Sequence, residues 1–457
     1  MVFSELMKNW IQNKIQKFNS DKDLSELING SATTLIIRLI GNAVGFLLMF
    51  LITRGYDENG AQIWGEYLLV VLVLRMFVIG GRFGADTALL RFVANFNAKG
   101  LKQNVRKVYK TALQLVIPIA LLLSASMYFS APFIAEKLEG VQVDNLQWLA
   151  LFVLPFSWFF VNTQCLRGLK NMKAFSFFFN TSVSTFSLLL LASLFFVDKQ
   201  SFLGDVNWPL YAFAFGVIVS FFLSLFWWIN SSKGDGYNEE IDVKTKQFLS
   251  TSAPLLLAQS ITFIMGWTDQ LMLGAMIDAE EVGIYGVAFK YSTLAVIFLM
   301  AINSISAPKF AEFHGSNDIK GLEKTVKHST KMIFWSTLPI VLMFCLLPEF
   351  FLGITGEQFR VASFTLILLM FGRFYSAISG SVGNILQMTG HQVIVQNIML
   401  VTAVINVILN LLLIPVYKME GAAIASLVSV IFWNTAMVIV VKRKLGFYSI
   451  YIPGLKI

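Results

Sequence analysis

The sequence predicts an all-α integral membrane protein with twelve transmembrane helices. Of its 457 residues, 56% are hydrophobic and only 14% are charged, whereas a soluble globular chain is about 45–50% apolar and about 25% charged. This composition leaves too little polar surface to cover a water-soluble particle. Apolar runs of the length that a membrane helix needs, roughly 20 residues, recur along the chain. Because these runs are continuous rather than alternating, they exclude a membrane β-barrel.

Taken in order, the runs predict twelve spans. They cover residues 31–53, 64–86, 108–130, 146–166, 174–197, 208–230, 250–276, 283–307, 331–353, 361–388, 392–415 and 421–441. Pro118, Pro155, Pro254 and Pro339 lie inside spans, where a proline kinks a membrane helix without having to end it.

The basic residues between the spans predict the topology. One side carries 25 lysines and arginines and the other side carries 5. The positive-inside rule assigns the richer side to the cytoplasm, so both termini are expected to be cytoplasmic. The net charge of +8 is then a topology signal, and no nucleic-acid partner is expected.

The spans divide the chain into four predicted parts. Residues 1–30 have apolar side chains at helical spacing with lysines between them, which favours an amphipathic segment on the inner leaflet. A soluble arm packed on the cytoplasmic loops is the alternative. Residues 31–240 and 241–445 are predicted to form two six-helix bundles, followed by a cytoplasmic tail at 446–457.

An internal repeat relates the two bundles. Ile63-Trp64-Gly65 resembles Ile284-Tyr285-Gly286 at an offset of 221, and Arg91-Phe92 corresponds to Lys309-Phe310 at an offset of 218. Six spans followed by six spans give both halves the same orientation, related by an axis along the membrane normal. Parallel repeats of this kind are typical of transporters that hold the substrate between the halves. Coincidence of short matches is the competing interpretation.

The sequence gives no sign of an enzyme, a cofactor or a metal site. Cys165 and Cys345 lie far apart in apolar runs, and the histidines (His314, His328 and His391) form no metal-binding pattern. No G-x-x-x-x-G-K-[ST] motif is present for nucleotide hydrolysis. A membrane-embedded glycosyltransferase would need carboxylates or histidines on a sizeable outer loop, and no predicted outer loop is that long.

Charged residues inside the spans are functional candidates, because each costs several kcal/mol unless it faces a cavity or a partner. These residues are Arg38, Arg75, Arg82, Asp86, Asp269, Lys290 and Arg373. Arg82 and Asp86 are one turn apart near a span end, so we expect a structural ion pair. Arg75 and Arg373 fall near span centres and Arg38 lies close to one, so we do not expect any of the three to face the lipid.

Asp269 and Lys290 lie at matching depth, each seven positions from the same predicted hairpin turn. Two interpretations stay open. The two residues neutralise each other, or Lys290 faces the cavity while Asp269 tunes it or binds a coupling cation.

Several short motifs are spread along the chain. They are Ile63-Trp64-Gly65, Gly84-x4-Leu89-x-Arg91-Phe92, Asp269-Gln270-Leu271-Met272-Leu273-Gly274, Asn384-x-Leu386-Gln387-x-Thr389-Gly390, Asn406-x3-Asn410-x4-Pro415 and Glu420-Gly421-Ala422-Ala423. Together these motifs resemble the polysaccharide-repeat flippases of the multidrug/oligosaccharidyl-lipid/polysaccharide exporter superfamily, and the resemblance spans roughly residues 30 to 445.

This resemblance implies a V-shaped, MATE-like transporter in a bacterial inner membrane that flips a polyprenyl-diphosphate-linked oligosaccharide for O-antigen, capsule or exopolysaccharide synthesis. It implies a polysaccharide polymerase as a partner, and a monomer is expected. In lipid-II-type relatives, basic residues on the first, second and eighth helices line a cationic cavity, which corresponds here to Arg38, Arg75 and Lys290. With Arg373, these residues are the predicted substrate-binding set.

The sign of the charges bears on the choice of substrate. An anionic diphosphate suits guanidinium groups, which bind phosphate oxygens bidentately. The alternative, a cation-coupled multidrug antiporter of the same superfamily, would want carboxylates in its cavity. The first span offers Arg38 and no acid.

Overall fold

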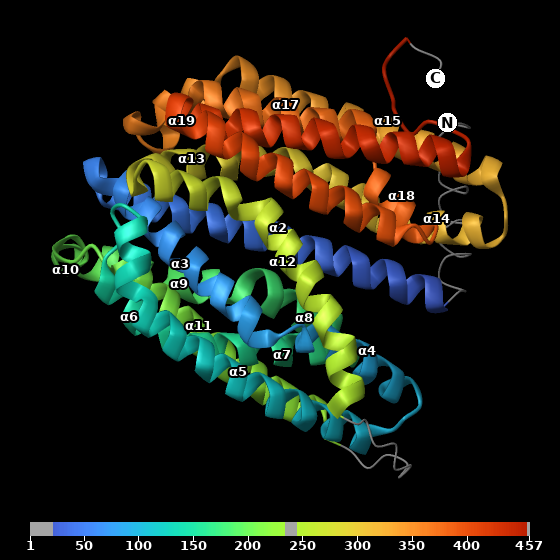
Figure 1. Ribbon diagram of the computed structural model, residues 1–457, viewed down its shortest axis with the longest axis horizontal. Coiled ribbons are helices and arrows are strands. Elements are labelled where there is room, and N and C mark those ends of the chain that lie inside the picture. The colour runs from blue at the N-terminus through green and yellow to red at the C-terminus, as the bar shows by residue number, and fades with distance from the viewer. Residues whose placement is uncertain (1–21, 234–244, 455–457) are drawn as a thin grey trace, which may run out of the picture.

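The computed structural model describes residues 22–233 and 245–454, and within these ranges the chain forms helices and no strand (Figure 1). The helices of the first half are α2 (Lys22–Gly55), η1 (Asp57–Asn59), α3 (Gly60–Arg82), α4 (Ala85–Ala98), α5 (Lys102–Lys137), α6 (Val143–Ala150), α7 (Val153–Gly168), α8 (Met172–Phe177), η2 (Phe178–Ser182), α9 (Val183–Val197), α10 (Lys199–Gly204) and α11 (Trp208–Ser231). The helices of the second half are α12 (Thr245–Met276), α13 (Ala279–Ser292), η3 (Thr293–Val296), α14 (Ile297–Gly315), α15 (Ile319–Leu346), α16 (Pro348–Thr355), η4 (Glu357–Ala362), α17 (Ser363–Ser379), α18 (Val382–Met388) and α19 (Gln392–Leu445).

The described helices provide the twelve predicted membrane crossings. Ten are long and apolar enough to span, and α6 with α7, bent by 50°, adds an eleventh. The twelfth comes from α19, whose 54 residues would be about 80 Å long if straight, far more than the roughly 30 Å of a bilayer core. Its backbone breaks at Lys418 (φ 47°), which separates the predicted spans 392–415 and 421–441.

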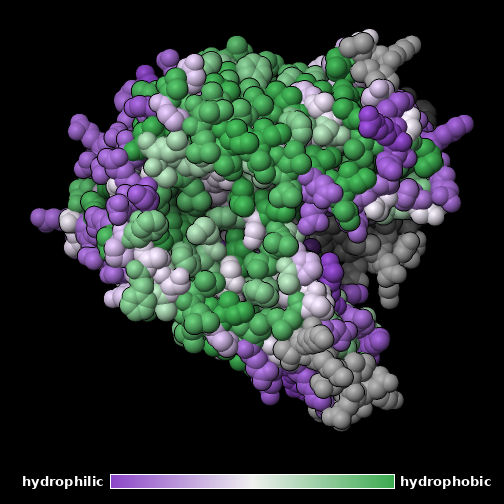
Figure 2. Space-filling model, viewed as in Figure 1, coloured by the Kyte–Doolittle hydropathy of each residue, from purple (hydrophilic) through white to green (hydrophobic). Residues whose placement is uncertain are grey.

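The outer surface is what a bilayer requires. Figure 2 shows a broad hydrophobic band, with hydrophilic residues gathered toward the two ends of the molecule. Large apolar side chains such as Phe129, Phe196 and Leu346 are at least 75% exposed within or beside the spans. A water-soluble protein does not expose a contiguous apolar surface of this size, so the protein is a multi-pass membrane protein.

The hydrophobic cores are arranged as in a V. One core contains buried residues of both halves, including Ile63, Leu146, Tyr285 and Phe359. Two further cores are separate. The first lies around α4, α5 and the start of α12, and the second lies around α14, α15, α18 and α19. Figure 1 shows the halves diverging on the side of α4 and α14, with α12 crossing between them.

We name the two ends of the molecule by their charge. The basic end carries the α4–α5 and α14–α15 connections and the end of α19 with Lys442, Arg443 and Lys444. The opposite end carries the α5–α6 connection and the break at Lys418. The halves share a core toward the opposite end and separate toward the basic end.

The halves meet in a reciprocal helix crossing at the opposite end. A Cβ on Gly65 would lie 1.6 Å from the carbonyl oxygen of Ala279, and a Cβ on Gly283 would lie 1.9 Å from that of Ala61. Only glycine permits backbones to approach this closely. Ala61 and Gly65 correspond to Ala279 and Gly283 at an offset of 218, so α3 and α13 cross through equivalent residues. The sequence match at 221 is therefore displaced by about one helical turn from the register of this contact.

Besides the span bent between α6 and α7, further predicted spans are interrupted. The span predicted at 64–86 is divided at Phe83 and Gly84, whose φ angles are 49° and 68°. Position 84 requires glycine, because a Cβ there would lie 2.3 Å from the Ser252 carbonyl oxygen of α12. The span predicted at 283–307 contains the 3-10 turn η3. The span predicted at 361–388 ends at Ser379, since Gly380 adopts φ 75° and α18 starts in a new direction.

The chain ends were predicted as cytoplasmic segments. Residues 1–21 of the predicted N-terminal segment lie outside the described residues, and 22–30 belong to α2. The C-terminal tail, described as far as residue 454, packs back on the second half at the basic end. There Tyr451 N–H donates to the Ile378 carbonyl at 3.0 Å, and the Ser449 hydroxyl donates to the Ser379 carbonyl at 3.0 Å.

Candidate functional site

A cavity of about 470 Å³ lies between the two halves, and we call it the central cavity. Its walls come from α2, α3, η2 and α9 of the first half and from α12, α13, α14 and α17 of the second. The volume is within the range of about 300–1,000 Å³ that is typical of small-ligand sites. The space exists because the halves pack together at one end and diverge at the other.

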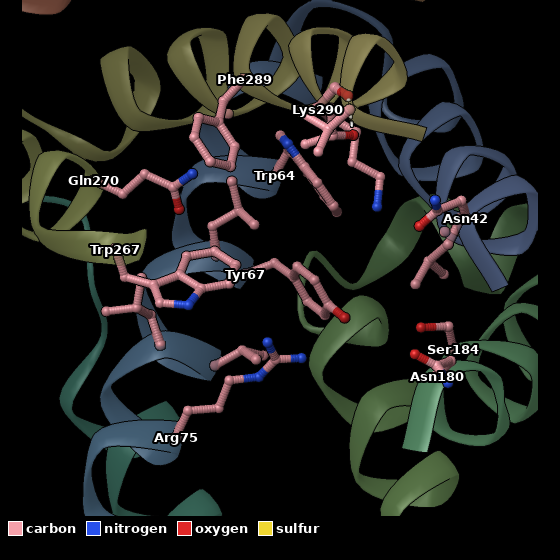
Figure 3. A pocket seen from close by; sticks show the side chains of 18 of the residues that line it. Asn42, Trp64, Tyr67, Arg75, Asn180, Ser184, Trp267, Gln270, Phe289 and Lys290 are labelled. Carbon is pink, nitrogen blue, oxygen red and sulfur yellow. Dashed lines mark hydrogen bonds between the residues drawn. The ribbon is translucent and has the colours of Figure 1, made fainter. Parts of the chain in front are cut away.

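The central cavity brings together the predicted substrate-binding residues. Arg38, Arg75, Lys290 and Arg373 all line it, although they come from α2, α3, α13 and α17. Figure 3 shows Arg75 and Lys290 extending into the space from opposite sides. Lys290 and Arg75 are close enough for their charges to interact.

These cations contact polar and aromatic groups of the cavity walls. Arg38 Nε donates to Asn180 Oδ1 at 3.4 Å, and Arg373 Nε donates to the Ser292 hydroxyl at 3.4 Å. The Arg75 guanidinium lies 5.7 Å from the ring centroid of Trp267, and the Lys290 ammonium lies 5.5 Å from that of Phe46.

Among the described residues, none of the four cations forms an ion pair, and the cavity lining contains no acidic side chain. Asp269, outside the lining, is close enough to Arg373 for the two charges to attract each other. Like charges gathered in a partly buried space repel each other, and each loses part of its hydration. The arrangement therefore favours an anionic ligand.

The remaining walls supply rings and amides. Trp64 and Tyr67 stack with ring centroids 5.2 Å apart. The Trp64 Nε1–H and the Gln270 Oε1 are buried without a hydrogen-bond partner in the described part of the chain. Buried polar atoms without partners are costly, so the cavity wall holds two polar groups whose hydrogen-bonding capacity is unused.

Trp64 and Gln270 stand in motifs quoted from the sequence but were not predicted to line a site, and Tyr67 and Trp267 were not singled out at all. Trp267 stands two positions before the singled-out Asp269, but aromatic residues are frequent throughout the chain and carry no signal of their own. Asn42 also lines the central cavity.

Asp269 lies behind the cavity in a hydrogen-bonded cluster of the second half. Its carboxylate accepts hydrogen bonds from the Tyr285 hydroxyl at 2.9 Å, Asn410 Nδ2 at 2.7 Å, Asn406 Nδ2 at 3.1 Å and the Ser426 hydroxyl. We call these five residues the Asp269 cluster. The structure thus pairs Asp269 with neutral donors of α13 and α19 and does not pair it with Lys290.

A signal for this cluster was present in the sequence. The Asn406-x3-Asn410 spacing puts both amides on one helix face. Their common partner on α12 could not be inferred from spacing alone. Asn410 Oδ1 is buried without a hydrogen-bond partner among the described residues, so an unused acceptor oxygen remains beside the carboxylate.

The expected structural ion pair is confirmed. Arg82 Nη1 lies 2.9 Å from Asp86 Oδ2 across the break between α3 and α4. Asp86 also accepts a hydrogen bond from Gln259 Nε2 of α12 at 3.0 Å. Neither charged residue lines the central cavity, so this pair fastens α12 to the first half.

Comparisons with known proteins agree with this architecture. A family model described as "Polysaccharide biosynthesis protein" matches residues 27–314, and a model described as "MatE" matches residues 254–412. The chain is 23% identical over 168 residues to the probable low-salt glycan biosynthesis flippase of Haloferax volcanii, and the match covers 36% of each chain. The matched segment thus spans about a third of that relative.

Two solved structures share the fold over nearly the whole chain. The lipid II flippase MurJ in an inward closed conformation superposes with a TM-score of 0.70 at 14% identity, covering 91% of this chain and 87% of that one. An inward-facing multidrug resistance transporter of the MATE family gives 0.63 at 15% identity, covering 90% and 98%. Since the first family model covers well over half of the 457 residues, the chain belongs to the polysaccharide biosynthesis protein family of the multidrug/oligosaccharidyl-lipid/polysaccharide exporter superfamily.

Proposed function

We propose that the protein flips a polyprenyl-diphosphate-linked oligosaccharide from the cytoplasmic to the outer leaflet of the plasma membrane, for assembly of a surface glycan. The observation that carries this proposal is the central cavity, in which Arg38, Arg75, Lys290 and Arg373 converge with no acidic residue in the lining. The family membership supports the transport of a glycan precursor, and the probable glycan flippase of Haloferax volcanii is a relative of this kind.

A diphosphate fits the four cations. Its oxygens accept the parallel N–H donors of a guanidinium group, and a lysine adds a mobile point charge. The cavity walls hold the charges in a partly dehydrated space, where attraction to an anion is stronger than in water. The polyprenyl chain would remain in the bilayer, since the exposed surface of the spans is apolar.

A multidrug antiporter for organic cations is the competing function. Such a transporter needs a carboxylate facing its cavity. Asp269 is the acidic residue singled out in the spans of the second half, and its carboxylate is occupied by four hydrogen-bond donors outside the cavity lining. The charge of the lining therefore favours the anionic lipid.

The proposed direction of transport rests on charge and on the membrane potential. We place the basic end and both termini in the cytoplasm, where the positive-inside rule puts them. The cavity is then loaded from the cytoplasmic side. A headgroup with two negative charges gains about 4–5 kcal/mol on crossing a potential of about 100 mV, inside negative. No hydrolysis of ATP is needed for such a bias.

We extend the proposal to organisation and coupling. The two units, residues 31–240 and 241–445, move relative to each other and expose the cavity alternately to the two sides of the membrane. A monomer is sufficient for transport. A polysaccharide polymerase receives the flipped product. Asp269 couples the movement to a monovalent cation, because its carboxylate and the unused Asn410 Oδ1 converge in one buried cluster. The protein itself carries out no covalent chemistry.

The experiment uses purified protein in liposomes that contain undecaprenyl diphosphate carrying a galactose-terminated disaccharide. Galactose oxidase added outside reports how much substrate reaches the outer leaflet. We expect wild-type protein to make the internal pool accessible, Arg75→Ala to abolish this activity and Arg75→Lys to retain part of it.

Arg91→Ala is the matched control, because Arg91 is an exposed arginine outside the central cavity. Full flipping by a folded Arg75→Ala protein would refute the proposal. So would ethidium transport by the wild-type protein without any movement of the lipid.

A further inference from the structure

A second cavity of about 320 Å³ lies within the second half, between α14, α17, α18 and α19. It adjoins the central cavity, because Val296 and Arg373 line both. We call it the side cavity. It lies toward the basic end, where α18 turns away from α17.

The side cavity has a different chemistry from the central one. Its polar lining consists of amides and hydroxyls, and Arg373 at the border is its sole charged lining residue. The neutral polar residues are Asn303, Ser376, Ser381, Asn384, Gln387 and Asn434. Trp433 adds an aromatic wall.

Part of this polar surface is fixed, and part of it is free. The Ser381 hydroxyl donates to Asn303 Oδ1, and Asn434 Nδ2 donates to the Ser376 hydroxyl at 3.1 Å. In contrast, the side-chain amides of Asn384 and Gln387 form no hydrogen bond with any other described residue. Each amide offers two N–H donors and one acceptor oxygen, so it can form hydrogen bonds with two neighbouring hydroxyl groups at once.

The backbone sets these two free amides at the cavity. Gly380, with φ 75°, ends α17, and a Cβ there would lie 2.2 Å from Thr330 Oγ1. The chain therefore turns sharply before α18. Asn384 and Gln387 are three positions apart and so share a face of α18. A Cβ on Gly383 would meet only Met437 Sδ, at 3.8 Å, so the space beside this face is open.

We propose that the side cavity binds the lipid-proximal sugar of the transported glycan, as a neutral pyranose. This inference rests on the proposed function, since the diphosphate in the central cavity would present its first sugar to Arg373 and the side cavity beyond. Hydroxyl groups meet the free amides, and the apolar face of the ring packs against Trp433. The volume is at the low end of the range of about 300–1,000 Å³ for ligand sites, which fits one or two sugar rings.

An apolar occupant is less suitable. A polyprenyl segment in the side cavity would cover Asn384 and Gln387 without satisfying their donors and acceptors, and unpaired polar groups are costly to bury. A sugar satisfies them. The division between a cationic cavity and a neutral one matches a ligand with a charged headgroup and an uncharged ring.

The test measures binding to purified protein with short-chain probes. These are farnesyl diphosphate and the same molecule carrying one glucose, galactose, mannose, N-acetylglucosamine or N-acetylgalactosamine. For the wild-type protein we expect at least one sugar-bearing probe to bind about tenfold more tightly than bare farnesyl diphosphate. The double variant Asn384→Leu, Gln387→Leu should lose this gain while its affinity for farnesyl diphosphate stays unchanged.

Gln396→Leu with Asn397→Leu is the matched control, because these amides are exposed on α19 and lie outside both cavities. It should keep the gain. The inference is overturned if no sugar probe binds more tightly than farnesyl diphosphate, or if the double variant weakens all probes equally. Failure of the proposed function has a different signature: farnesyl diphosphate then fails to bind the wild-type protein or binds Arg75→Ala equally well.

Discussion

Gly45 of α2 faces the ammonium group of Lys290 of α13, and a Cβ at position 45 would lie 2.8 Å from Lys290 Nζ. Lys290 is one of the cations that the sequence predicts to line the cavity. The contact adds that a glycine on the other half of the molecule leaves the room for its charge.

The first prediction follows from this contact. Gly45→Leu should push the Lys290 side chain away from the central cavity and weaken binding of farnesyl diphosphate about tenfold, or about 1.4 kcal/mol. Lys290 ends in a flexible chain, so folding should be little affected. Gly266→Leu on α12 is the control, because a Cβ there meets nothing within 4 Å. Unchanged affinity in Gly45→Leu would contradict the role of Lys290.

The second prediction concerns closure of the opposite end. Arg54 of α2 donates from Nε to the Ile354 carbonyl at 3.0 Å and from Nη2 to the Gly353 carbonyl at 3.0 Å, so it ties the first half to α16. Arg54→Ala should favour opening at this end. In a variant without native cysteines, Asn42→Cys should then react faster with an impermeant reagent added outside cells.

The control for Arg54 is Arg360→Ala, because Arg360 pairs locally with Glu357 at 2.9 Å. Its removal should leave the labelling rate of Asn42→Cys unchanged. Equal labelling rates in the Arg54 variant and its parent would show that this bridge does not hold the closed end.

The third prediction separates coupling from substrate binding. Asp269→Asn keeps the size of the side chain and removes its charge. We expect lipid flipping in liposomes to lose its dependence on an imposed sodium or proton gradient, while the affinity for farnesyl diphosphate stays within twofold of wild type. A variant that responds normally to both gradients would assign the Asp269 cluster to structure alone.

The fourth prediction concerns topology. Lys320 stands one position after the start of α15 at the basic end and is exposed. A cysteine at position 320 should resist an impermeant reagent in whole cells and react after permeabilisation. Strong labelling in intact cells would reverse the proposed orientation.

The membrane spans and the cavity cations were predictable because both follow from solvation. A run of apolar residues has one favourable place in a bilayer, and a charge such as Arg75 must leave the lipid. Neither prediction requires knowledge of which residues lie nearby in the folded protein. The separation of two spans near Lys418 was also predictable, since the polar stretch between them interrupts the hydrophobic pattern.

The interruptions within spans were not predictable, since they depend on tertiary contacts. Phe83 adopts a left-handed backbone because the chain turns where α12 approaches Gly84. The partners of Asp269 come from segments 16 to 157 residues away in sequence. The side cavity exists because the chain turns at Gly380, so that α18 leads away from α17. No local sequence pattern predicts the direction of α18.

The core shared by the two halves has a thermodynamic consequence. If the halves separate at the opposite end, apolar side chains of that core become exposed to water. Exposure of apolar surface raises the heat capacity, by about 0.45 cal/mol/K for each Å². The equilibrium between the two access states should therefore give a curved van't Hoff plot. The shared core would make the populations of these states depend on temperature.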